Sequence, residues 1–335
     1  MSGLQLTYLS GDAIAGLDLP DERLLAAVET ALAAQGRGEA VLEPRVHLFP
    51  DPNVEGHFNV LRGALPARHR AGVKVVGDYV HNHRLGLPSE LALQLVMDTR
   101  TGAPLAVLDA TAITAMRTGA TTAVGARYLA RPDSRVLGHI GSRGTAYWNV
   151  RLLCHVLPGL EEVRIHSLRR ERREALAARL AAETGRDVRA VNGWEEAVRG
   201  ADIVVEATRL QKPEPLLRTE WIAPGALVVP YGTMSAVELS LTDIMDKIVV
   251  DDWGQAGAGP LGALRAHVDS GRLTRESLHA EIGEIVCGAR PGRENPGETC
   301  LFWHRGLSIC DLSVALEILH IASVENLVRI LAYRS

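Results

Sequence analysis

A glycine-rich turn between an apolar run and a segment with helical spacing offers the clearest chemistry in this sequence. The run covers residues 136–141, and the helical segment is predicted over 147–157. A strand that enters a helix through such a turn brings backbone N–H groups and the positive end of the helix to the pyrophosphate of a dinucleotide. We therefore predict an NAD(P) site here, although arginine replaces the second glycine of the usual fingerprint. The predicted contacts are Gly141, Ser142, Arg143, Gly144, Thr145 and Ala146.

The residues after the next predicted strand, 163–167, indicate which dinucleotide binds. NAD-binding domains usually carry an acidic residue there, which hydrogen-bonds the ribose hydroxyls. Here Ser167 is followed by Arg169 and Arg170, and a hydroxyl with two guanidinium groups suits a 2′-phosphate. We expect NADP(H) to bind in preference to NAD(H). The alternative is that these arginines form the solvated start of a helix over 170–184.

Three basic residues lie among apolar or small residues in the first 120 positions. Arg45 lies beside a predicted strand, Lys74 interrupts a run of valines, and Arg117 lies in a helix of Ala, Thr and Gly. A buried ammonium group is costly unless an anion pairs with it. Three cations that converge would bind a carboxylate. The structural alternatives are an exposed strand edge for Arg45, a snorkelling side chain for Lys74 and an ion pair with Asp109 for Arg117.

Apolar periodicity and turn signals predict the elements that position these residues. A helix is expected over 20–35, a long helix of small residues over 112–130, and a last helical pattern over 306–333. The proline- and glycine-rich segment 291–297 is typical of a mobile loop. The predicted strands are 46–49, 58–65, 73–80, 91–98 and 104–109, and later 163–167, 201–208 and 225–230.

Strands that alternate with helices after about residue 134 predict parallel βαβ units and an α/β fold class. We expect a Rossmann dinucleotide-binding domain over residues 121–304. The last helix is expected to pack back onto the N-terminal part. The other α/β domain would then be discontinuous and contain residues 1–120 and 305–335.

Composition narrows the class of protein. The 335 residues are 47% hydrophobic with a net charge of −4, which gives no reason to expect nucleic acid or an anionic membrane as partner. The apolar runs are too short for a membrane span, and the start lacks the pattern of a signal peptide. No metal site is expected, and the widely spaced cysteines are typical of reduced thiols in a cytoplasmic protein. They are Cys154, Cys287, Cys300 and Cys310.

A series of short motifs resembles the ornithine cyclodeaminase/μ-crystallin family. The motifs keep their order and spacing over nearly the whole chain. They are residues 44–47, 72–74, 86–89, 101–109, 117–118, 129–134, 288–293, 301–302, 306–307 and 311–312. The resemblance implies a homodimer. Each subunit would combine an α/β substrate-binding and dimerisation domain with the Rossmann domain, and the active site would lie in the cleft between them.

The resemblance also implies roles for the three cations. Arg45, Lys74 and Arg117 would hold the carboxylate of a small α-amino, α-imino or α-keto acid. In reductase members the lysine is a candidate proton donor to the imine nitrogen, which fits a pKa lowered by burial and neighbouring cations. Further cofactor contacts are expected from Thr118, Thr208, Gly232, Met234 and Gly306.

Two departures separate the sequence from ornithine cyclodeaminases. Met234 stands where those enzymes carry an aspartate that binds the distal amine, and a thioether cannot accept a proton. The strand near Asn59 also lacks their glutamate. The expected pocket residues are instead Arg62, His81, Tyr231, Trp303 and His304. His304 could titrate near neutral pH, with a packed histidine as the alternative. For Arg62 the alternative is a salt bridge on a strand edge.

Together these features predict an NAD(P)H-dependent oxidoreductase acting on the C–N bond of a small α-imino or α-amino acid. Such an enzyme would be an imine reductase or an amino-acid dehydrogenase, with Lys74, Arg117 and His304 as its catalytic residues. One alternative is a cyclodeaminase, a lyase that uses tightly held NAD without net redox change. Another is a non-catalytic protein that binds NADP and a small ligand.

Overall fold

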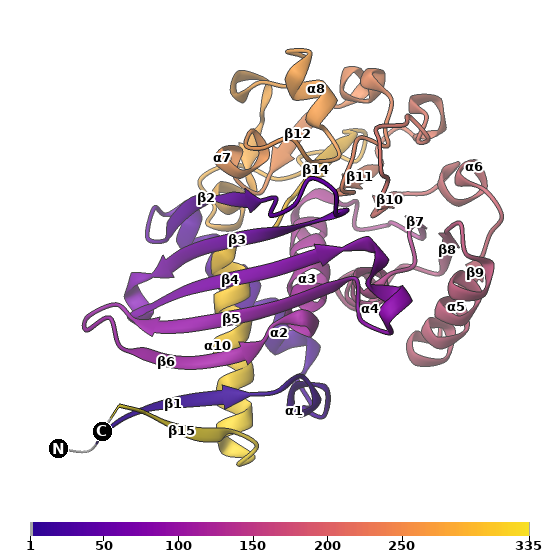
Figure 1. Cartoon of the computed structure of the whole chain (residues 1–335). Helices are drawn as coiled ribbons and strands as arrows, with labels where there is room; N and C mark the ends of the chain where they lie inside the picture. Colours follow the sequence, from indigo (N-terminus) through magenta and orange to yellow (C-terminus); the bar gives the residue numbers. More distant parts are fainter. Residues whose placement is uncertain (1–2, 335) are drawn as a thin grey trace. The chain divides into compact units, whose positions relative to one another are not determined.

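The computed structural model describes residues 3–334, and the chain divides into two compact units (Figure 1). The first unit contains the residues up to Arg117 and those from Gly306 onward, and the second runs from Thr118 to Arg305. Each unit is built on its own sheet. Helix α3 (Thr111–Leu129) begins in the first unit and continues into the second.

The first unit contains a seven-stranded sheet in the order β15-β1-β6-β5-β4-β3-β2. The pair β1 and β6 is parallel, and the other neighbours are antiparallel. Lys74 lies in β4, opposite Leu61 of β3 and Gln94 of β5. The strands are β1 (Leu4–Leu9), β2 (Val41–Leu48), β3 (Gly56–Leu65), β4 (Arg70–Tyr79), β5 (Glu90–Asp98), β6 (Pro104–Asp109) and β15 (Arg329–Arg334).

Helices cover one face of this sheet. Helix α10 (Ser308–Val324) packs against β3, β4 and β5, and α2 (Asp21–Gly36) packs against α10 (Figure 1). Because side chains alternate between the faces of a strand, Leu91, Leu93 and Leu95 of β5 are exposed while the residues between them are buried. The short helices of this unit are α1 (Gly11–Ala15), η1 (Pro66–Arg68) and η2 (Val80–Leu85).

The helix expected over 306–333 is shorter than predicted, and this expectation was wrong at its C-terminal end. Helix α10 ends at Val324, Asn326 takes a φ of +57°, and the chain then continues as β15, antiparallel to β1. Asparagine tolerates this left-handed conformation, which breaks the helix. The apolar run after Asn326 is too short for its periodicity to separate helix from strand. Strand β1 was not predicted either.

The second unit contains an eight-stranded sheet in the order β13-β12-β14-β11-β10-β7-β8-β9, with parallel neighbours throughout. From the neighbouring strands β7 and β10, the sheet continues through β8 to β9 at one edge and through β11, β14 and β12 to β13 at the other. In such doubly wound sheets ligands bind beyond the C-terminal ends of the strands at this switch point. The strands are β7 (Val136–Ile140), β8 (Glu162–His166), β9 (Asp187–Ala190), β10 (Ile203–Glu206), β11 (Leu227–Pro230), β12 (Lys247–Val250), β13 (Ala280–Glu281) and β14 (Cys300–Trp303).

The α/β fold class with a Rossmann-type parallel sheet is confirmed. Helix α5 ends, as predicted, at Thr184, and Gly185 caps it with a φ of +66°. No helix among residues 3–334 has both the length and the apolar character needed to cross a bilayer. The helices of the second unit are α4 (Gly144–Val156), α5 (Arg170–Thr184), α6 (Trp194–Val198), η3 (Thr219–Trp221), η4 (Leu239–Ile244), α7 (Trp253–Ala256), α8 (Arg265–Asp269), η5 (Arg275–Ser277) and α9 (Ile282–Val286).

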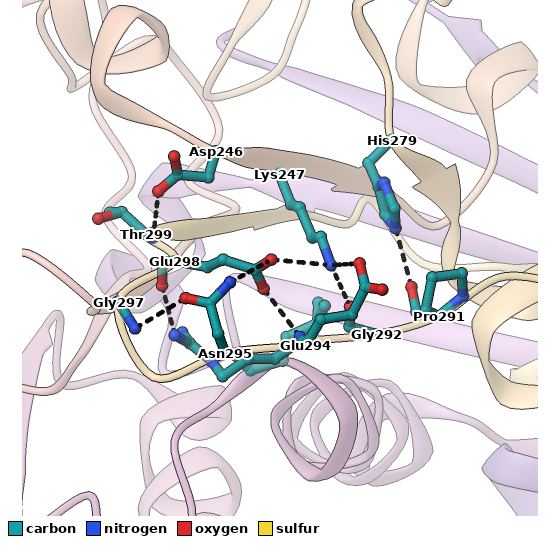
Figure 2. Close-up of polar contacts among 12 residues, drawn as sticks. Asp246, Lys247, His279, Pro291, Gly292, Glu294, Asn295, Gly297, Glu298 and Thr299 are labelled. Carbon is teal, nitrogen blue, oxygen red and sulfur yellow. Dashed lines mark hydrogen bonds and ion pairs between the residues drawn. The ribbon is translucent and has the colours of Figure 1, made fainter.

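The segment 291–297 is anchored to the second unit by charged side chains (Figure 2). Lys247, the first residue of β12, donates from Nζ to the carbonyl oxygen of Gly292 at 2.6 Å and to the carboxylate of Glu294 at 2.7 Å. Its ammonium group also lies 3.2 Å from the carboxylate of Glu298. The proline and glycine content of this segment predicts a mobile loop, but these contacts hold it against β12.

Candidate functional site

Three cations gather around one buried carboxylate in the first unit. Lys74 is 1% exposed, and its Nζ lies 2.5 Å from Oδ1 of Asp311 on α10. Arg117 of α3 donates from Nε to the same oxygen at 2.8 Å. Arg45 of β2 donates from Nη2 to the carbonyl oxygen of Gly306 at 3.0 Å. The structure thus brings together the three cations that the sequence predicted would converge, and Asp311 supplies one balancing negative charge.

Burial lowers the pKa of Lys74 to about 8. The charge of Asp311 and its hydrogen bond oppose this effect, whereas the charges of Arg117 and Arg45 lower the pKa further. Nζ also donates to Oγ1 of Thr114 at 3.2 Å. A lysine with this pKa is protonated at neutral pH, and it releases its proton more readily than an ordinary lysine, as a general acid requires.

The structure excludes the structural alternative for Lys74 and gives Arg117 a different ion-pair partner from the one expected. Lys74 does not snorkel, because its ammonium group is buried with the rest of the side chain. Arg117 forms an ion pair, but the partner is Asp311, while the carboxylate of Asp109 accepts a hydrogen bond from the backbone N–H of Thr111. Sequence reasoning missed Asp311. The signal was an acidic residue in the first turn of an otherwise apolar helix, combined with the need of a buried lysine for an anion.

Gly306 makes room for the guanidinium group of Arg117. Its φ is +87°, and a Cβ at this position would overlap the Arg117 guanidinium. Its carbonyl oxygen is also the acceptor for Arg45. The sequence predicted Gly306 as a cofactor contact, but the structure places it in the cation cluster.

Arg62 and His81, predicted as substrate-binding residues, pair with other groups. Arg62 lies 3.5 Å from Glu43 on the neighbouring strand, and Nε2 of His81 lies 2.8 Å from Glu55. All four side chains are exposed. Within residues 3–334, neither predicted side chain forms a hydrogen bond or ion pair with the cation cluster. For Arg62 the structure favours the strand-edge salt bridge.

A pocket in the second unit lies beyond the C-terminal ends of β7, β8 and β10. Gly141 has a φ of +114°, and a Cβ there would lie 2.8 Å from the carbonyl oxygen of Ala207, so the turn requires glycine. The hydroxyls of Ser142 and Ser167 are 2.8 Å apart and join the turn to the end of β8. Six predicted cofactor residues line the pocket: Gly141, Ser142, Arg143, Ser167, Arg169 and Thr208.

Helix α4 begins at Gly144, three residues earlier than predicted, with Arg143 at its N-cap. Gly144, Thr145 and Ala146 therefore form its first turn, where backbone N–H groups have no carbonyl four residues earlier in the helix to donate to, and the N–H of Ala146 donates to the carbonyl oxygen of Arg143 at 2.9 Å. Because this turn directly follows the pocket residues, the positive end of α4 is suited to a phosphate.

Four arginines contribute to the lining of this pocket. Arg169 and Arg172 line it, together with Arg143 and Arg209, and the described lining residues include no acidic side chain. Arg170 does not line the pocket, since it pairs with Glu174 one turn along α5 at 2.7 Å. This corrects the prediction for Arg170, whose expected place belongs to Arg172. The sequence also missed the apolar lining residues, which are Ile140, Leu168, Trp194, Ala207, Leu210 and Leu216.

Three other predicted cofactor residues, Thr118, Gly232 and Met234, do not line this pocket. Thr118 is buried in α3. The backbone N–H of Gly232 donates to the carboxylate of Glu206 at 3.2 Å. Glu206 is fully buried at the end of β10, and burial raises its pKa to about 7. Glu206 thus links the segments that follow β10 and β11, a role that sequence reasoning missed.

Tyr231 and His304 stack on each other after the neighbouring strands β11 and β14. Their ring centroids are 4.7 Å apart, and Nε2 of His304 lies 2.9 Å from Oγ1 of Thr122. His304 is buried, which favours the packed-histidine alternative. Trp303, predicted in the substrate pocket, lies instead in the hydrophobic core of the second unit, in a strand whose four residues are all buried.

Comparison with known proteins identifies the family. The model of the ornithine cyclodeaminase/mu-crystallin family matches residues 12–325. The chain belongs to this family. An alanine dehydrogenase from Archaeoglobus fulgidus is 34% identical over 317 residues, which cover 93% of this chain and 94% of that protein.

Two solved structures of family relatives resemble the chain closely. The Thermococcus litoralis Δ1-pyrroline-2-carboxylate reductase, in complex with NADH and L-proline, has a TM-score of 0.89 and 29% identity, and the match covers 96% of this chain and 98% of that one. An archaeal alanine dehydrogenase dimer with bound NAD has a TM-score of 0.90 and 29% identity, with 98% and 100% covered.

Proposed function

We propose that this protein is an NAD(P)H-dependent oxidoreductase that acts on the C–N bond of a small α-imino or α-amino acid. The observation that carries the proposal is the cluster of Arg45, Lys74 and Arg117, in which the buried Lys74 and Arg117 share one oxygen of Asp311 and Arg45 lies close enough to lower the pKa of Lys74. Guanidinium and ammonium groups gathered in this way suit the carboxylate of a ligand. The reactions named for its relatives, alanine dehydrogenase and pyrroline-2-carboxylate reductase, belong to this class.

In this proposal Arg45 and Arg117 bind the substrate's carboxylate and orient its α-carbon. Lys74 donates a proton from Nζ to the substrate nitrogen in the reductive direction and accepts it in the oxidative direction. Its lowered pKa suits both transfers near neutral to mildly alkaline pH. A bound nicotinamide dinucleotide supplies or accepts the hydride.

The residues of the second unit fit a dinucleotide. Gly141, Ser142 and the first turn of α4 would hold the pyrophosphate. Because residue 141 is a glycine, it has no side chain that would keep the pyrophosphate away from the backbone N–H groups. Ser167, Arg169 and Arg172 would hold a 2′-phosphate, and the absence of an acid among the described lining residues removes the usual repulsion. These features support a preference for NADP(H) over NAD(H).

Replacing Arg169 and Arg172 together with alanine is expected to weaken NADPH binding about 100-fold or more, because charge-assisted hydrogen bonds contribute about 1.5–3 kcal/mol each and two of them are lost. NADH affinity should change little. Fluorescence titration with both nucleotides measures the effect, and Arg170→Ala is the matched control because Arg170 pairs with Glu174. Equal losses for NADPH and NADH would contradict the proposed 2′-phosphate site.

We also propose that two copies associate through the exposed face of the first sheet. Leu91, Leu93 and Leu95 are 41%, 54% and 38% exposed in a row along β5, and apolar patches of this kind mark association surfaces. The similar archaeal alanine dehydrogenase is a dimer.

Analytical ultracentrifugation measures the mass of the protein in solution. The wild type should have twice the mass of one chain, which is 36.1 kDa, and Leu93→Lys should have the mass of a single chain. Leu239→Lys, at an exposed leucine of the second unit, is the control. A monomeric wild type would disprove the dimer.

A cytoplasmic location completes the proposal. Among the described residues, no disulfide joins the four cysteines, and a reducing compartment keeps such thiols unmodified. The same compartment would supply the small amino and keto acids that the proposed reaction consumes.

A further inference from the structure

We propose that Asp311 is a positioning residue that keeps Lys74 protonated and holds it in place for proton transfer. This inference rests on the proposed function, because it concerns the group assigned there as the proton donor. It adds a residue from α10 to a cluster whose cations come from β2, β4 and α3. Lys74 and Asp311 are separated by 237 positions in the sequence, so only the fold brings them together.

One carboxylate oxygen fixes two of the cations. Oδ1 of Asp311 accepts from Nζ of Lys74 at 2.5 Å and from Nε of Arg117 at 2.8 Å. Charge-assisted hydrogen bonds of this length are directional, so the two cations keep a fixed relation to each other. Oδ2 is buried and has no hydrogen-bond partner among the described residues. A buried oxygen of this kind is completed by a water or by a proton donor on a ligand.

Asp311 is the anion among the groups that face Lys74. Helix α3 contributes Arg117 and the hydroxyl of Thr114, and β2 contributes Arg45. The paired positions on β3 and β5, Leu61 and Gln94, are neutral. Without the negative charge, a buried ammonium group would face two guanidinium groups, and both burial and repulsion would favour its neutral form.

A purely structural ion pair would not need this arrangement. Such a pair contributes little net stability when buried, and apolar replacements are often as stable. Here one oxygen of Asp311 accepts from both Lys74 and Arg117, and Arg45 adds a further positive charge that acts on Lys74. The carboxylate therefore offsets part of the repulsion at Lys74 and favours its protonated form.

The lysine content of the chain allows a direct test. The sequence contains three lysines, Lys74, Lys212 and Lys247, so protein labelled with ¹³C and ¹⁵N in lysine gives three side-chain NMR signals. Lys212→Arg and Lys247→Arg assign them. Asp311→Asn preserves the size and one acceptor oxygen but removes the charge. We expect the titration midpoint of Lys74, near pH 8 in the wild type, to fall by about one pH unit or more, with Lys212 unchanged.

Enzyme kinetics provide the second readout. The alkaline limb of kcat/KM for imine reduction should move to lower pH in Asp311→Asn by the same amount as the NMR midpoint. The loss of activity would then be about fivefold larger at pH 8 than at pH 6, because a midpoint that falls from about pH 8 to about pH 7 lowers the protonated fraction at pH 8 from about one half to about one tenth. Asp311→Glu restores the charge and should return both midpoints toward the wild-type values.

An Asp311→Asn protein with the wild-type Lys74 midpoint and pH profile would overturn the proposal. If this variant does not fold, Asp311→Glu decides, because a Lys74 midpoint that falls although the charge is present contradicts the role of the carboxylate. Failure of the wild type to reduce any imine would instead contradict the proposed function. The NMR titration of Lys74 does not depend on turnover, so the two failures are distinguishable.

Discussion

Lys74→Met is expected to reduce turnover about 1,000-fold or more while leaving dinucleotide affinity unchanged. A general acid contributes typically about 10²–10⁴-fold, and the variant also removes one of three carboxylate-binding charges. Methionine fills most of the lysine's volume, so the core around β4 is preserved. Steady-state NADPH oxidation gives the turnover, and fluorescence titration gives the affinity separately. The two readouts differ because the pocket of the second unit contains no residue of the cation cluster.

Lys212→Met is the matched control, because Lys212 is exposed and lies outside both sites. It should retain wild-type turnover. A Lys74→Met enzyme with a tenth or more of wild-type activity would remove Lys74 from the mechanism. Thermal unfolding of both variants checks that the comparison is made between folded proteins.

Gly306→Ala is expected to raise the KM for the carboxylate substrate about 100-fold, equivalent to about 2.7 kcal/mol. The new Cβ overlaps the Arg117 guanidinium, and the φ of +87° is unfavourable for alanine. Arg117 must therefore move, and with it the contact that Asp311 makes. The peptide carrying the acceptor for Arg45 is also disturbed. Substrate titrations at saturating dinucleotide measure KM and kcat, and dinucleotide affinity should be unchanged.

Gly102→Ala is the control that separates the overlap with Arg117 from the backbone strain of an alanine at positive φ. Gly102 also belongs to the first unit and has a φ of +71°, but a Cβ there would meet nothing within 4 Å. It should cost about 1 kcal/mol of stability without raising KM. If Gly306→Ala raised KM no more than Gly102→Ala does, the cluster would not depend on the space that Gly306 provides.

The sequence predicted those parts of the fold whose signals are local. The sequence predicts strand, turn, helix, strand and helix over residues 136–184, because the glycines at 141 and 185 mark turns and the apolar spacing between them is regular. The C-terminal strand β15 and its partner β1 could not be assigned in this way. Their pairing joins the two ends of the chain, and short apolar runs carry no information about a distant partner.

In the candidate site, too, the residues with a local sequence signal were predicted and those that depend on distant contacts were not. Arg45, Lys74 and Arg117 were found because a charge within an apolar or small-residue segment is visible in the sequence itself. Asp311 was missed, since its importance comes only from a contact with residues about 200 positions away. Arg172 was passed over for Arg170 because the direction of each side chain depends on the phase of α5, which composition does not fix.

We propose that the protein transfers a hydride at a C–N bond next to a carboxylate. The absorbance of NADPH tests this transfer most directly when it is followed with cyclic imine carboxylates and with α-keto acids plus ammonia or amines, and when the amino-acid product is quantified. We predict substrate-dependent NADPH oxidation with one amino acid formed per NADPH consumed. Ammonia released from a diamino acid with no net change in NAD(P)H absorbance, and no imine reduced, would contradict the account and indicate a cyclodeaminase.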